Sequence, residues 1–244
     1  MENKIIDIHT HILYGMDDGA SNREMSMKLM GMEYEQGVRG IFLTNHSGGY
    51  LKHGINNYER RFETLKRLAH DVYPDLRLYN GSEILCFKDW MPDVIRNIRR
   101  GVFPTMNHTE YVLIEFAPNE CKGMLEMTYC IKSILDAGYK PIIAHIERYK
   151  KIYNDPYEDI EMLREMGCLT QINLYSFAQD KGDRHELANM YMEHFMFDFV
   201  GTDTHRTDYK AAEAKVGALY LEGKLGGHAK FHLGNNASHL LIGG

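Results

Sequence analysis

The chain has 244 residues and a formal net charge of −6, with 44% hydrophobic and 25% charged residues. These proportions are ordinary for a soluble globular protein, and the mild acidity argues against a nucleic-acid-binding surface, which usually needs a basic patch. No segment is apolar for the roughly 18 residues of a membrane helix, and the N-terminus does not resemble a signal peptide, so we expect a cytoplasmic protein without membrane insertion.

Strand-like and helix-like segments alternate along the whole chain. The run Ile5-Ile6 predicts the end of a first strand, and the other six expected strands are Val38–Thr44, Leu76–Asn80, Tyr111–Phe116, Pro141–Ala144, Leu169–Asn173 and Asp198–Gly201. The expected helices are Ser21 to about Gln36, Tyr58–Val72, Asp93–Arg99, Met124–Ala137, Tyr157–Met166, His185–Phe195, Tyr209–Leu221 and Asn236–Leu241.

Local signals mark the ends of several predicted helices. Ser21 and Glu24 fit a capping box in which Ser21 is the N-cap residue. Gly37, Gly138 and Gly167 are placed where glycine commonly ends a helix. The segment Ser47-Gly48-Gly49-Tyr50 is expected to be a loop.

Seven strand–helix units in succession predict parallel strands with helical crossovers. Without a linker, a repeat or a low-complexity segment, residues 1–244 are expected to form one α/β domain. A barrel explains the sequence better than an open sheet, because the candidate functional residues follow many different strands. In a barrel the loops at the carboxyl ends of the strands share one site.

The segment Asp7-Ile8-His9-Thr10-His11 follows the first apolar run. Side chains at i and i+2 of a strand leave on the same side, so His9 and His11 should face one way, together with Asp7. Two neighbouring imidazoles can bind a metal ion. Asp17 and Asp18 follow in a glycine-flanked loop that can bring a carboxylate back to the same place. His-x-His alone fits equally well with two polar residues at a solvent-facing strand end.

Further histidines and carboxylates follow the later strands, and they are His46, Glu83, Glu115, His145, Asp203 and His205. A ligand set of nitrogen and oxygen atoms without cysteine fits manganese, iron or zinc. Three divalent cations carry more positive charge than four carboxylates can neutralise, and a net positive site favours a phosphate dianion. Such a site can lower the pKa of a bridging water, which is the chemistry of phosphoester hydrolysis.

Two arginines are candidates for binding the phosphate. Arg148 comes three residues after His145, and its guanidinium could hold phosphate oxygens in a bidentate manner. It could equally form a surface ion pair with Glu147 or Glu165. Arg206 directly follows His205 and has the same two interpretations.

The motifs DIHTHILYGMDDGA, TNH, GSEI, LIEFA, AHIERY, TQIN and GTDTH occur in this order along nearly the whole chain. Together they resemble the PHP (polymerase and histidinol phosphatase) superfamily, and most closely its bacterial protein-tyrosine phosphatases of capsule and exopolysaccharide loci. The resemblance implies a distorted seven-stranded, TIM-like β/α barrel, the PHP fold. It also implies two or three metal ions, usually manganese, with iron or zinc as alternatives.

The resemblance further implies a set of metal ligands, namely His9, His11, Asp18, His46, Glu83, Glu115, His145, Asp203 and His205. It implies that Arg148 binds phosphate and acts in catalysis with Asp203 and His205. The implied partner is the phosphotyrosine tail of a membrane-associated tyrosine autokinase that drives polysaccharide polymerisation. An oligomer would be compatible with this role.

Two departures from the family pattern concern substrate binding. The family usually places basic residues just after the second-strand histidine, whereas here Ser47-Gly48-Gly49-Tyr50 follows and Lys52 is the nearest cation. The family also tends to carry a second arginine several residues beyond the Asp-x-His pair, whereas here Arg206 is adjacent to it. Arg206 or Lys52 could replace the missing basic residues, and we expect weaker peptide binding.

Three other functions compete with this interpretation. A small-molecule phosphatase, such as histidinol-phosphate phosphatase, would share the metal ligands. An amidohydrolase also opens with His-x-His, but it typically supplies a modified lysine where this chain has Glu115. A non-catalytic interaction protein on a decayed scaffold would be expected to have lost some of the ligands.

Overall fold

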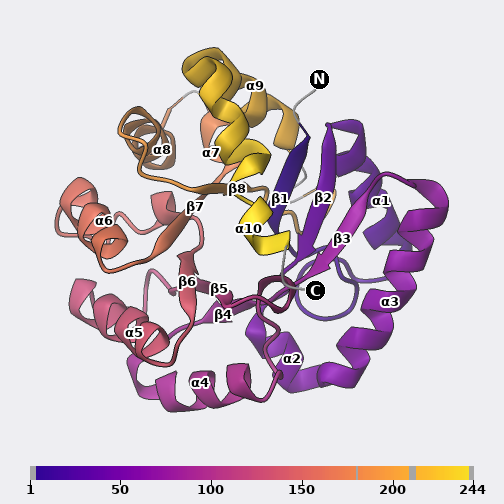
Figure 1. Cartoon of the computed structure of the whole chain (residues 1–244), viewed down its shortest axis with the longest axis horizontal. Coiled ribbons are helices and arrows are strands. Elements are labelled where there is room, and N and C mark those ends of the chain that lie inside the picture. The colour runs from indigo at the N-terminus through magenta and orange to yellow at the C-terminus, as the bar shows by residue number, and fades with distance from the viewer. Residues whose placement is uncertain (1–3, 180, 209–212, 242–244) are drawn as a thin grey trace.

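The structure is a computed structural model that describes residues 4–179, 181–208 and 213–241. Parallel strands lie at the centre and helices surround them (Figure 1). The strands are β1 (Ile5–Thr10), β2 (Val38–Leu43), β3 (Arg77–Asn80), β4 (Glu83–Leu85), β5 (Tyr111–Glu115), β6 (Lys140–Ile143), β7 (Leu169–Asn173) and β8 (Phe199–Gly201).

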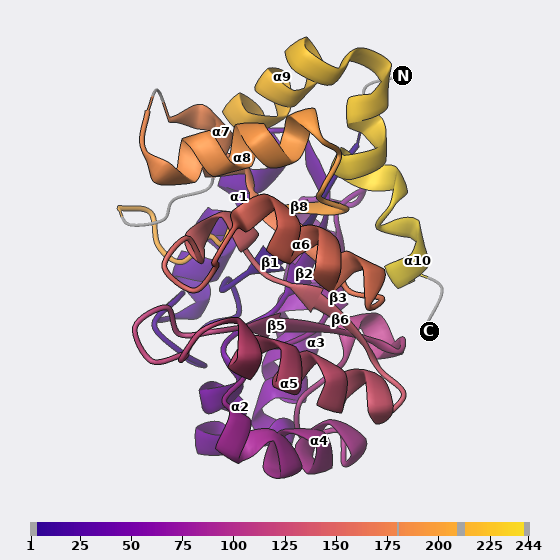
Figure 2. The ribbon, with the colours of Figure 1, turned by 90° about the vertical axis from the view of Figure 1, so that its left-hand side faces the viewer.

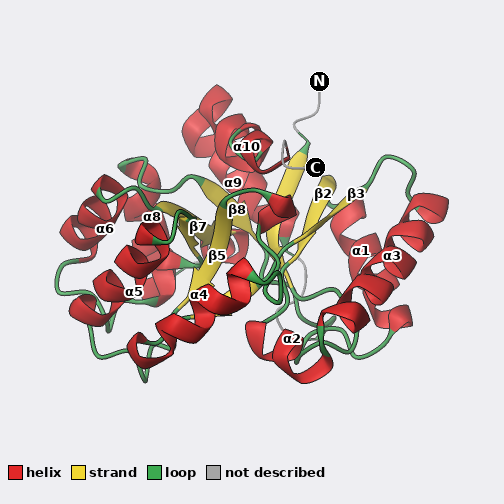
Figure 3. Cartoon of the chain, turned by 60° about the horizontal axis from the view of Figure 1, so that its bottom comes forward, coloured by secondary structure: helices red, strands yellow, loops and turns green. Residues whose placement is uncertain are grey.

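The helices are α1 (Arg23–Glu35), α2 (Ser47–His53), α3 (Ile55–Val72), α4 (Met91–Arg99), α5 (Met124–Asp136), α6 (Pro156–Glu165), α7 (Leu174–Ala178), α8 (Asp183–Glu193), α9 (Ala214–Leu225) and α10 (Ser238–Leu241). Helices α1 and α3 lie on one side of the strands, and α5, α6 and α8 lie on the other (Figure 3). Figure 2 shows α5, α6 and α8 following one another along that second side.

The strands follow one another around a distorted barrel. One parallel sheet has the order β1-β2-β3, and the other has the order β4-β5-β6-β7-β8. Two isolated bridges connect the sheets, between His46 and Glu83 and between Thr10 and Thr204. Three of the four bridge residues, Thr10, His46 and Thr204, lie at or just beyond the carboxyl end of a strand, beside the candidate site residues.

The predicted third strand, Leu76–Asn80, corresponds to β3, and β4 is an additional strand that was not predicted, so eight strands are described where seven were expected. Residues Gly81 and Ser82 separate the two strands, so β3 pairs with β2 while β4 pairs with β5. The tyrosine hydroxyl of Tyr50 donates a hydrogen bond of 2.6 Å to the Gly81 carbonyl at this break. A Cβ atom at Gly81 would lie only 2.9 Å from the side chain of Thr44, so the break is closely packed.

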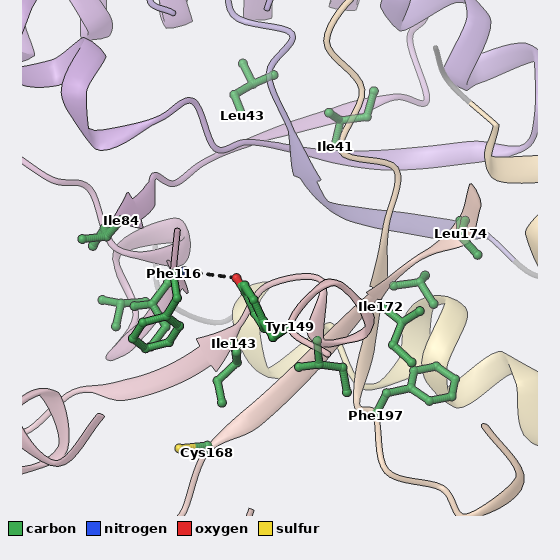
Figure 4. Close-up of a cluster of buried hydrophobic side chains, with 14 of the residues drawn as sticks. Ile41, Leu43, Ile84, Phe116, Ile143, Tyr149, Cys168, Ile172, Leu174 and Phe197 are labelled. Carbon is green, nitrogen blue, oxygen red and sulfur yellow. Dashed lines mark hydrogen bonds between the residues drawn. The ribbon is translucent and has the colours of Figure 1, made fainter. Parts of the chain in front are cut away.

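Apolar side chains alternate along the strands between the barrel interior and the helix layer. A small cluster joins different strands across the interior and includes Ile8, Phe42, Leu113, Ile142 and Phe199. The larger cluster packs between the strands and the helices, and Figure 4 shows part of it, including Ile41, Ile143 and Ile172.

The C-terminal helix α10 closes one end of the barrel. Its Leu240 and the preceding Ala237 belong to the interior cluster rather than to the helix layer. In Figure 1 this helix lies over the middle of the ring. The opposite end of the barrel, where the strands have their carboxyl ends, carries the predicted metal ligands.

Several local expectations are confirmed, and others are wrong. Gly37, Gly138 and Gly167 do follow helices with positive φ angles of 96°, 91° and 102°. The N-cap of α1 is Asn22 and not Ser21, because the Asn22 side chain accepts the hydrogen bond from the Met25 amide.

The expected loop at residues 47–50 forms the first part of helix α2. The helix expected from Tyr209 begins at Ala214 as described, and residues 209–212 lie outside the described residues. A π-helical turn, Phe231–Asn235, precedes α10, which begins two residues later than the predicted Asn236. Among the described residues, no helix is both long and apolar enough to cross a membrane.

Candidate metal centre

The nine predicted metal ligands come together at the carboxyl ends of the strands, and Glu83 lies at their centre. The Glu83 side chain is fully buried. Its Oε1 lies 3.2 Å from His9 Nε2 and 3.0 Å from His145 Nε2. Its Oε2 lies 2.9 Å from His46 Nδ1 and 3.2 Å from His11 Nε2. One carboxylate from β4 therefore contacts imidazoles at or just beyond the carboxyl ends of β1, β2 and β6.

Three overlapping groups of side chains are arranged so that they could each hold a cation. Within each group the candidate ligand atoms lie within 4.8 Å of one another. The groups are His9, His11 and Glu83; His46, Glu83 and Glu115; and His11, Asp18, His46 and His205. Their shared members are typical of a cluster in which one side chain contacts more than one ion.

Three further carboxylates contact the histidines of these groups. Asp203 Oδ1 lies 3.5 Å from His11 Nε2, and Glu115 Oε1 lies 3.0 Å from His46 Nδ1. Asp18 Oδ1 lies 3.6 Å from the Nε2 atoms of both His46 and His205. The Asp18 side chain is 65% exposed, so the centre opens to solvent beside it.

Two ligand candidates depend on left-handed backbone turns. His145 has a φ of 36° and Asp203 a φ of 55°, which are uncommon for residues with a Cβ atom. Each follows the end of a strand, where the chain would otherwise continue its alternation of side-chain directions. Strained backbone of this kind is often found at functional sites.

Asp17, which was noted in the loop but not among the predicted ligands, supports the cluster. Its Oδ2 accepts from His11 Nδ1 at 2.8 Å and from the His46 amide at 2.8 Å, while its Oδ1 accepts from Asn45 Nδ2 at 2.8 Å. An acceptor at Nδ1 leaves the Nε2 lone pair of His11 directed at the centre. Metal-binding histidines commonly have a carboxylate partner of this kind. The adjacent pair Asp17-Asp18 was the only sequence signal for it.

Asp7 does not join the cluster, contrary to the expectation from strand alternation. Its carboxylate accepts hydrogen bonds from the Thr202 amide at 3.1 Å and from the Thr202 hydroxyl at 2.5 Å. The pairing of β1 with β2 has an irregular register between Asp7 and Thr10. This irregularity breaks the two-residue alternation on which the prediction depended.

The nitrogen atoms in the centre are arranged as a cation would require. His9 Nε2 and His11 Nε2 lie 3.3 Å apart. When both rings carry their proton on Nδ1, two lone pairs face each other, which is unfavourable unless a positive charge lies near them. In addition, His145 Nδ1 is buried and has no hydrogen-bond partner among the described residues. The residues present therefore fit divalent cations.

The pKa values of the side chains in the centre also indicate that it favours positive charge. Burial would lower the pKa of His46, but the carboxylates of Glu83 and Glu115 outweigh burial and raise it to about 12. Burial likewise opposes a charge on His11, yet nearby carboxylates raise its pKa to about 9. For Glu83, the surrounding imidazoles overcome burial and hold the pKa well below its usual value. His145 differs, because burial and then the Arg148 guanidinium lower its pKa to about 3.

Arg148 faces the centre rather than a surface carboxylate. Its Nη1 donates to Asp203 Oδ2 at 3.1 Å. Glu147 is buried instead against other partners and accepts from the Ser176 hydroxyl at 2.7 Å. Arg206 and Lys52, the two candidates for the missing basic residues, have exposed side chains.

Known proteins share both the sequence and the fold of this chain. The tyrosine-protein phosphatase CpsB of Streptococcus pneumoniae is 32% identical over 211 residues, which are 84% of each chain. The tyrosine-protein phosphatase YwqE of Bacillus subtilis is 29% identical over 240 residues, covering 97% of this chain and 91% of that protein.

Solved structures are also similar to this chain. A structure from the study of YwqE from Bacillus subtilis and CpsB from Streptococcus pneumoniae, which are described as metal-dependent tyrosine phosphatases, has a TM-score of 0.83. It is 26% identical and covers 98% of this chain and 95% of its own. A phosphotriesterase homology protein from Escherichia coli is 9% identical with a TM-score of 0.57 and shares the fold alone.

The family described as "Capsular polysaccharide synthesis, CpsB/CapC" matches residues 5–242. That match spans every motif on which the resemblance was based, from DIHTHILYGMDDGA to GTDTH. The chain belongs to the CpsB/CapC family of capsular polysaccharide synthesis proteins.

Proposed function

We propose that this protein is a metal-dependent protein-tyrosine phosphatase. The observation that carries the proposal is the convergence of five histidines and three other carboxylates around the buried Glu83, with the Arg148 guanidinium at its border. The relatives named as tyrosine-protein phosphatases support the choice of substrate. All residues required by the proposal lie around one barrel of strands. We therefore also propose that residues 1–244 act as one domain.

The proposed cofactor is manganese, as two or three ions, with iron or zinc as alternatives. The proposed ligands are His9, His11, Asp18, His46, Glu83, Glu115, His145, Asp203 and His205. Nitrogen and oxygen ligands without sulfur suit these metals. Bound divalent cations would lower the pKa of a water molecule and stabilise negative charge on the phosphate oxygens.

The protein side chains have separate roles in the proposed hydrolysis. The oxygen of a water molecule forms the new bond to phosphorus while the bond between phosphorus and the tyrosine oxygen breaks. The products are inorganic phosphate and tyrosine, whose phenolate oxygen takes up a proton from water. Arg148 binds the non-bridging phosphate oxygens, and its hydrogen bond to Asp203 holds the guanidinium beside the centre.

The exposed side of the centre favours a macromolecular substrate. His9, His11 and Glu83 are fully buried, whereas His46 and Asp18 have side chains that are 31% and 65% exposed. A phosphate group on a flexible tail could therefore approach from the side of Asp18. We propose the phosphotyrosine tail of a cytoplasmic-facing, membrane-associated tyrosine kinase as the substrate, consistent with a family that acts in capsule synthesis.

The first test measures metal and activity together. Elemental analysis of undialysed protein should show two or three transition-metal ions per chain, and a chelator should remove phosphotyrosine hydrolysis until metal is restored. Less than one ion per chain, together with activity that resists chelation, would refute the metal centre.

The second test distinguishes tyrosine phosphatase from small-molecule phosphatase. The value of kcat/KM should be compared for a tyrosine-phosphorylated kinase tail, p-nitrophenyl phosphate, a phosphoserine peptide and histidinol phosphate. We expect the tyrosine-phosphorylated tail to be favoured, with a high KM because the usual basic residues after His46 are missing. A preference of about tenfold for histidinol phosphate, equal to about 1.4 kcal/mol in the transition state, would favour the small-molecule function instead.

A further inference from the structure

Strand β7 brings two amide side chains, Gln171 and Asn173, to the border of the metal centre. Neither belongs to the proposed ligand set. Both are buried, with relative exposures of 0% and 8%. They lie in the TQIN motif, which has no part in metal binding or substrate binding in the proposed function.

The orientation of the Gln171 amide follows from a backbone donor. The His145 amide N–H can only donate, and it points at Gln171 Oε1 at 2.9 Å. The same oxygen lies 3.1 Å from His9 Nδ1, so His9 carries its hydrogen on Nδ1 and directs Nε2 at Glu83. The other end of the amide, Nε2, donates to Asn173 Oδ1 at 2.9 Å.

The orientation of Asn173 follows in turn. Because its Oδ1 accepts from Gln171, its Nδ2 must be the atom that lies 3.3 Å from Asp203 Oδ2. Arg148 Nη1 donates to the same oxygen at 3.1 Å. Two donors therefore hold Oδ2, which leaves Oδ1 directed at His11 Nε2, 3.5 Å away.

We propose that Gln171 and Asn173 form an amide relay that positions Asp203 and, through it, the phosphate-binding Arg148. The inference rests on the proposed phosphatase function. The relay fixes the orientation of the Asp203 carboxylate, with one oxygen towards the imidazoles and the other towards the guanidinium. Arg148 has five N–H donors, and a fixed contact to one carboxylate oxygen orients the rest of the guanidinium for a phosphate. Gln171 and Asn173 are positioning residues, since they act through Asp203.

The test uses substitutions that keep the shape of the side chain but replace its hydrogen-bond donor by an acceptor. Asn173→Asp keeps the acceptor for Gln171 but places a carboxylate oxygen against Asp203 Oδ2. The repulsion shifts this oxygen and the Arg148 guanidinium bound to it, while Oδ1 stays directed at the imidazoles. Gln171→Glu removes the donor to Asn173, which then turns its own donor towards position 171 and its oxygen towards Asp203. The second substitution reaches the same result from a residue that hydrogen-bonds neither Asp203 nor Arg148.

Asn80→Asp is the matched control. Asn80 has the same 8% exposure as Asn173, and its Nδ2 lies 3.1 Å from His108 Nε2, which is not among the proposed ligands. We expect each relay variant to lower kcat/KM on a phosphotyrosine peptide by about tenfold or more, mainly through KM, at unchanged metal content. Asn80→Asp should stay within about twofold of wild type on the same scale.

A double-substitution cycle separates positioning from general structure. In an Arg148→Ala background, Asn173→Asp should cost less than about twofold, because the guanidinium that it positions is absent. An equal cost in both backgrounds, loss of metal from the Asn173→Asp protein, or wild-type kinetics would each overturn the relay. Should the Asn173→Asp protein not fold, Gln171→Glu carries the same comparison.

Binding of inorganic phosphate keeps this test separate from the proposed activity. Calorimetry on the metal-loaded proteins should show about tenfold weaker phosphate binding by both relay variants and not by Asn80→Asp. A wild-type protein that hydrolyses no phosphate ester would refute the proposed function, and the phosphate affinities would still decide for or against the relay.

Discussion

The Glu83 carboxylate is completely buried and lies against four imidazoles. This arrangement is typical of a functional site and not of a stabilising core. Removing a carboxylate from water costs several kcal/mol unless charged or polar partners compensate. Here His9, His11, His46 and His145 provide the partners, with all four nitrogen contacts between 2.9 and 3.2 Å. The ligand roles themselves remain a prediction, which substitution of single side chains can test.

Arg148→Ala should lower kcat/KM for phosphotyrosine by about tenfold to a hundredfold. The loss of a charge-assisted contact to phosphate costs on the order of 1.5–3 kcal/mol. We expect a strong rise in KM together with a lower kcat. Steady-state kinetics should show Arg206→Ala nearer to wild type, because Arg148 contacts Asp203. The reverse pattern would mean that the wrong arginine was assigned to the phosphate.

Asp203→Asn and His145→Ala should each abolish hydrolysis and leave the fold largely intact. At Asp203 the new amide must still present its oxygen to Arg148 and Asn173, so its NH₂ group would point at the imidazoles and repel a cation. Circular dichroism and metal analysis should accompany the kinetics. Retained turnover in a correctly folded variant would remove that residue from the centre.

The two ends of the strands serve different purposes. The carboxyl ends of β1 and β6 lead into His11 and His145, which both contact Glu83 at the start of β4. At the amino ends, polar side chains instead fasten strands to helices. Asp198, just before β8, accepts from Arg164 Nη1 at 3.1 Å and from the Thr170 amide at 2.9 Å. In barrels of this kind the amino-terminal face contributes to stability and the opposite face to chemistry.

Asp198→Ala should therefore lower the free energy of unfolding without changing kcat. The loss of the contacts to Thr170 and Arg164 is expected to cost about 1–3 kcal/mol, because an amide and a guanidinium lose their acceptor. Urea denaturation measures the first quantity and steady-state kinetics the second. A large fall in kcat in a stable Asp198→Ala protein would contradict this division between the two faces.

The closure of the whole barrel depends on a buried polar network behind the centre. Glu33 of α1 accepts a hydrogen bond from the Thr204 hydroxyl at 2.9 Å, and the same oxygen lies 3.0 Å from the Thr202 hydroxyl. The Thr202 hydroxyl donates to Asp7 of β1. This network joins the segment after β8 to β1 and α1, at the place where the strand order returns to its beginning.

The stability of this network should depend on pH. Burial, and then the charge on Asp7, raises the pKa of Glu33 well above its ordinary value. The folded protein thus retains a proton that the unfolded chain releases above a pKa of about 4.3. The stabilisation is complete below that pH and is lost as the pH rises towards the folded pKa.

Glu33→Gln keeps an acceptor oxygen for the Thr204 hydroxyl but cannot ionise. The wild-type protein should therefore lose stability relative to Glu33→Gln as the pH rises from about 5 to 8. Urea unfolding of both proteins in the presence of a chelator measures the difference, since the histidine cluster then titrates equally in both. A difference that does not change with pH would show that Glu33 is not held in its neutral form.

Much of the fold was predictable from local sequence, because periodicity and glycine placement act over a few residues. The predicted strands from Val38 to Gly201 all occur, and helices end at Gly37, Gly138 and Gly167 as expected. The prediction that Ser21 is the N-cap was wrong, because the neighbouring Asn22 can also cap a helix and only the backbone path selects one of them. Helix α2 was missed because Gly48 and Gly49 are poor helix formers.

The sequence alone also determined which residue types follow which strands, and with them the candidate ligands from His9 to His205. Only the tertiary structure decided how they are used. Asp7 turned away from the cluster at an irregular strand pairing, whereas Asp17 and Gln171 became supports of His11 and His9. These outcomes depend on contacts between residues as far apart as 195 positions, which no local pattern encodes. Parallel strands bring their carboxyl ends together, but backbone turns and hydrogen-bond partners determine which atoms meet.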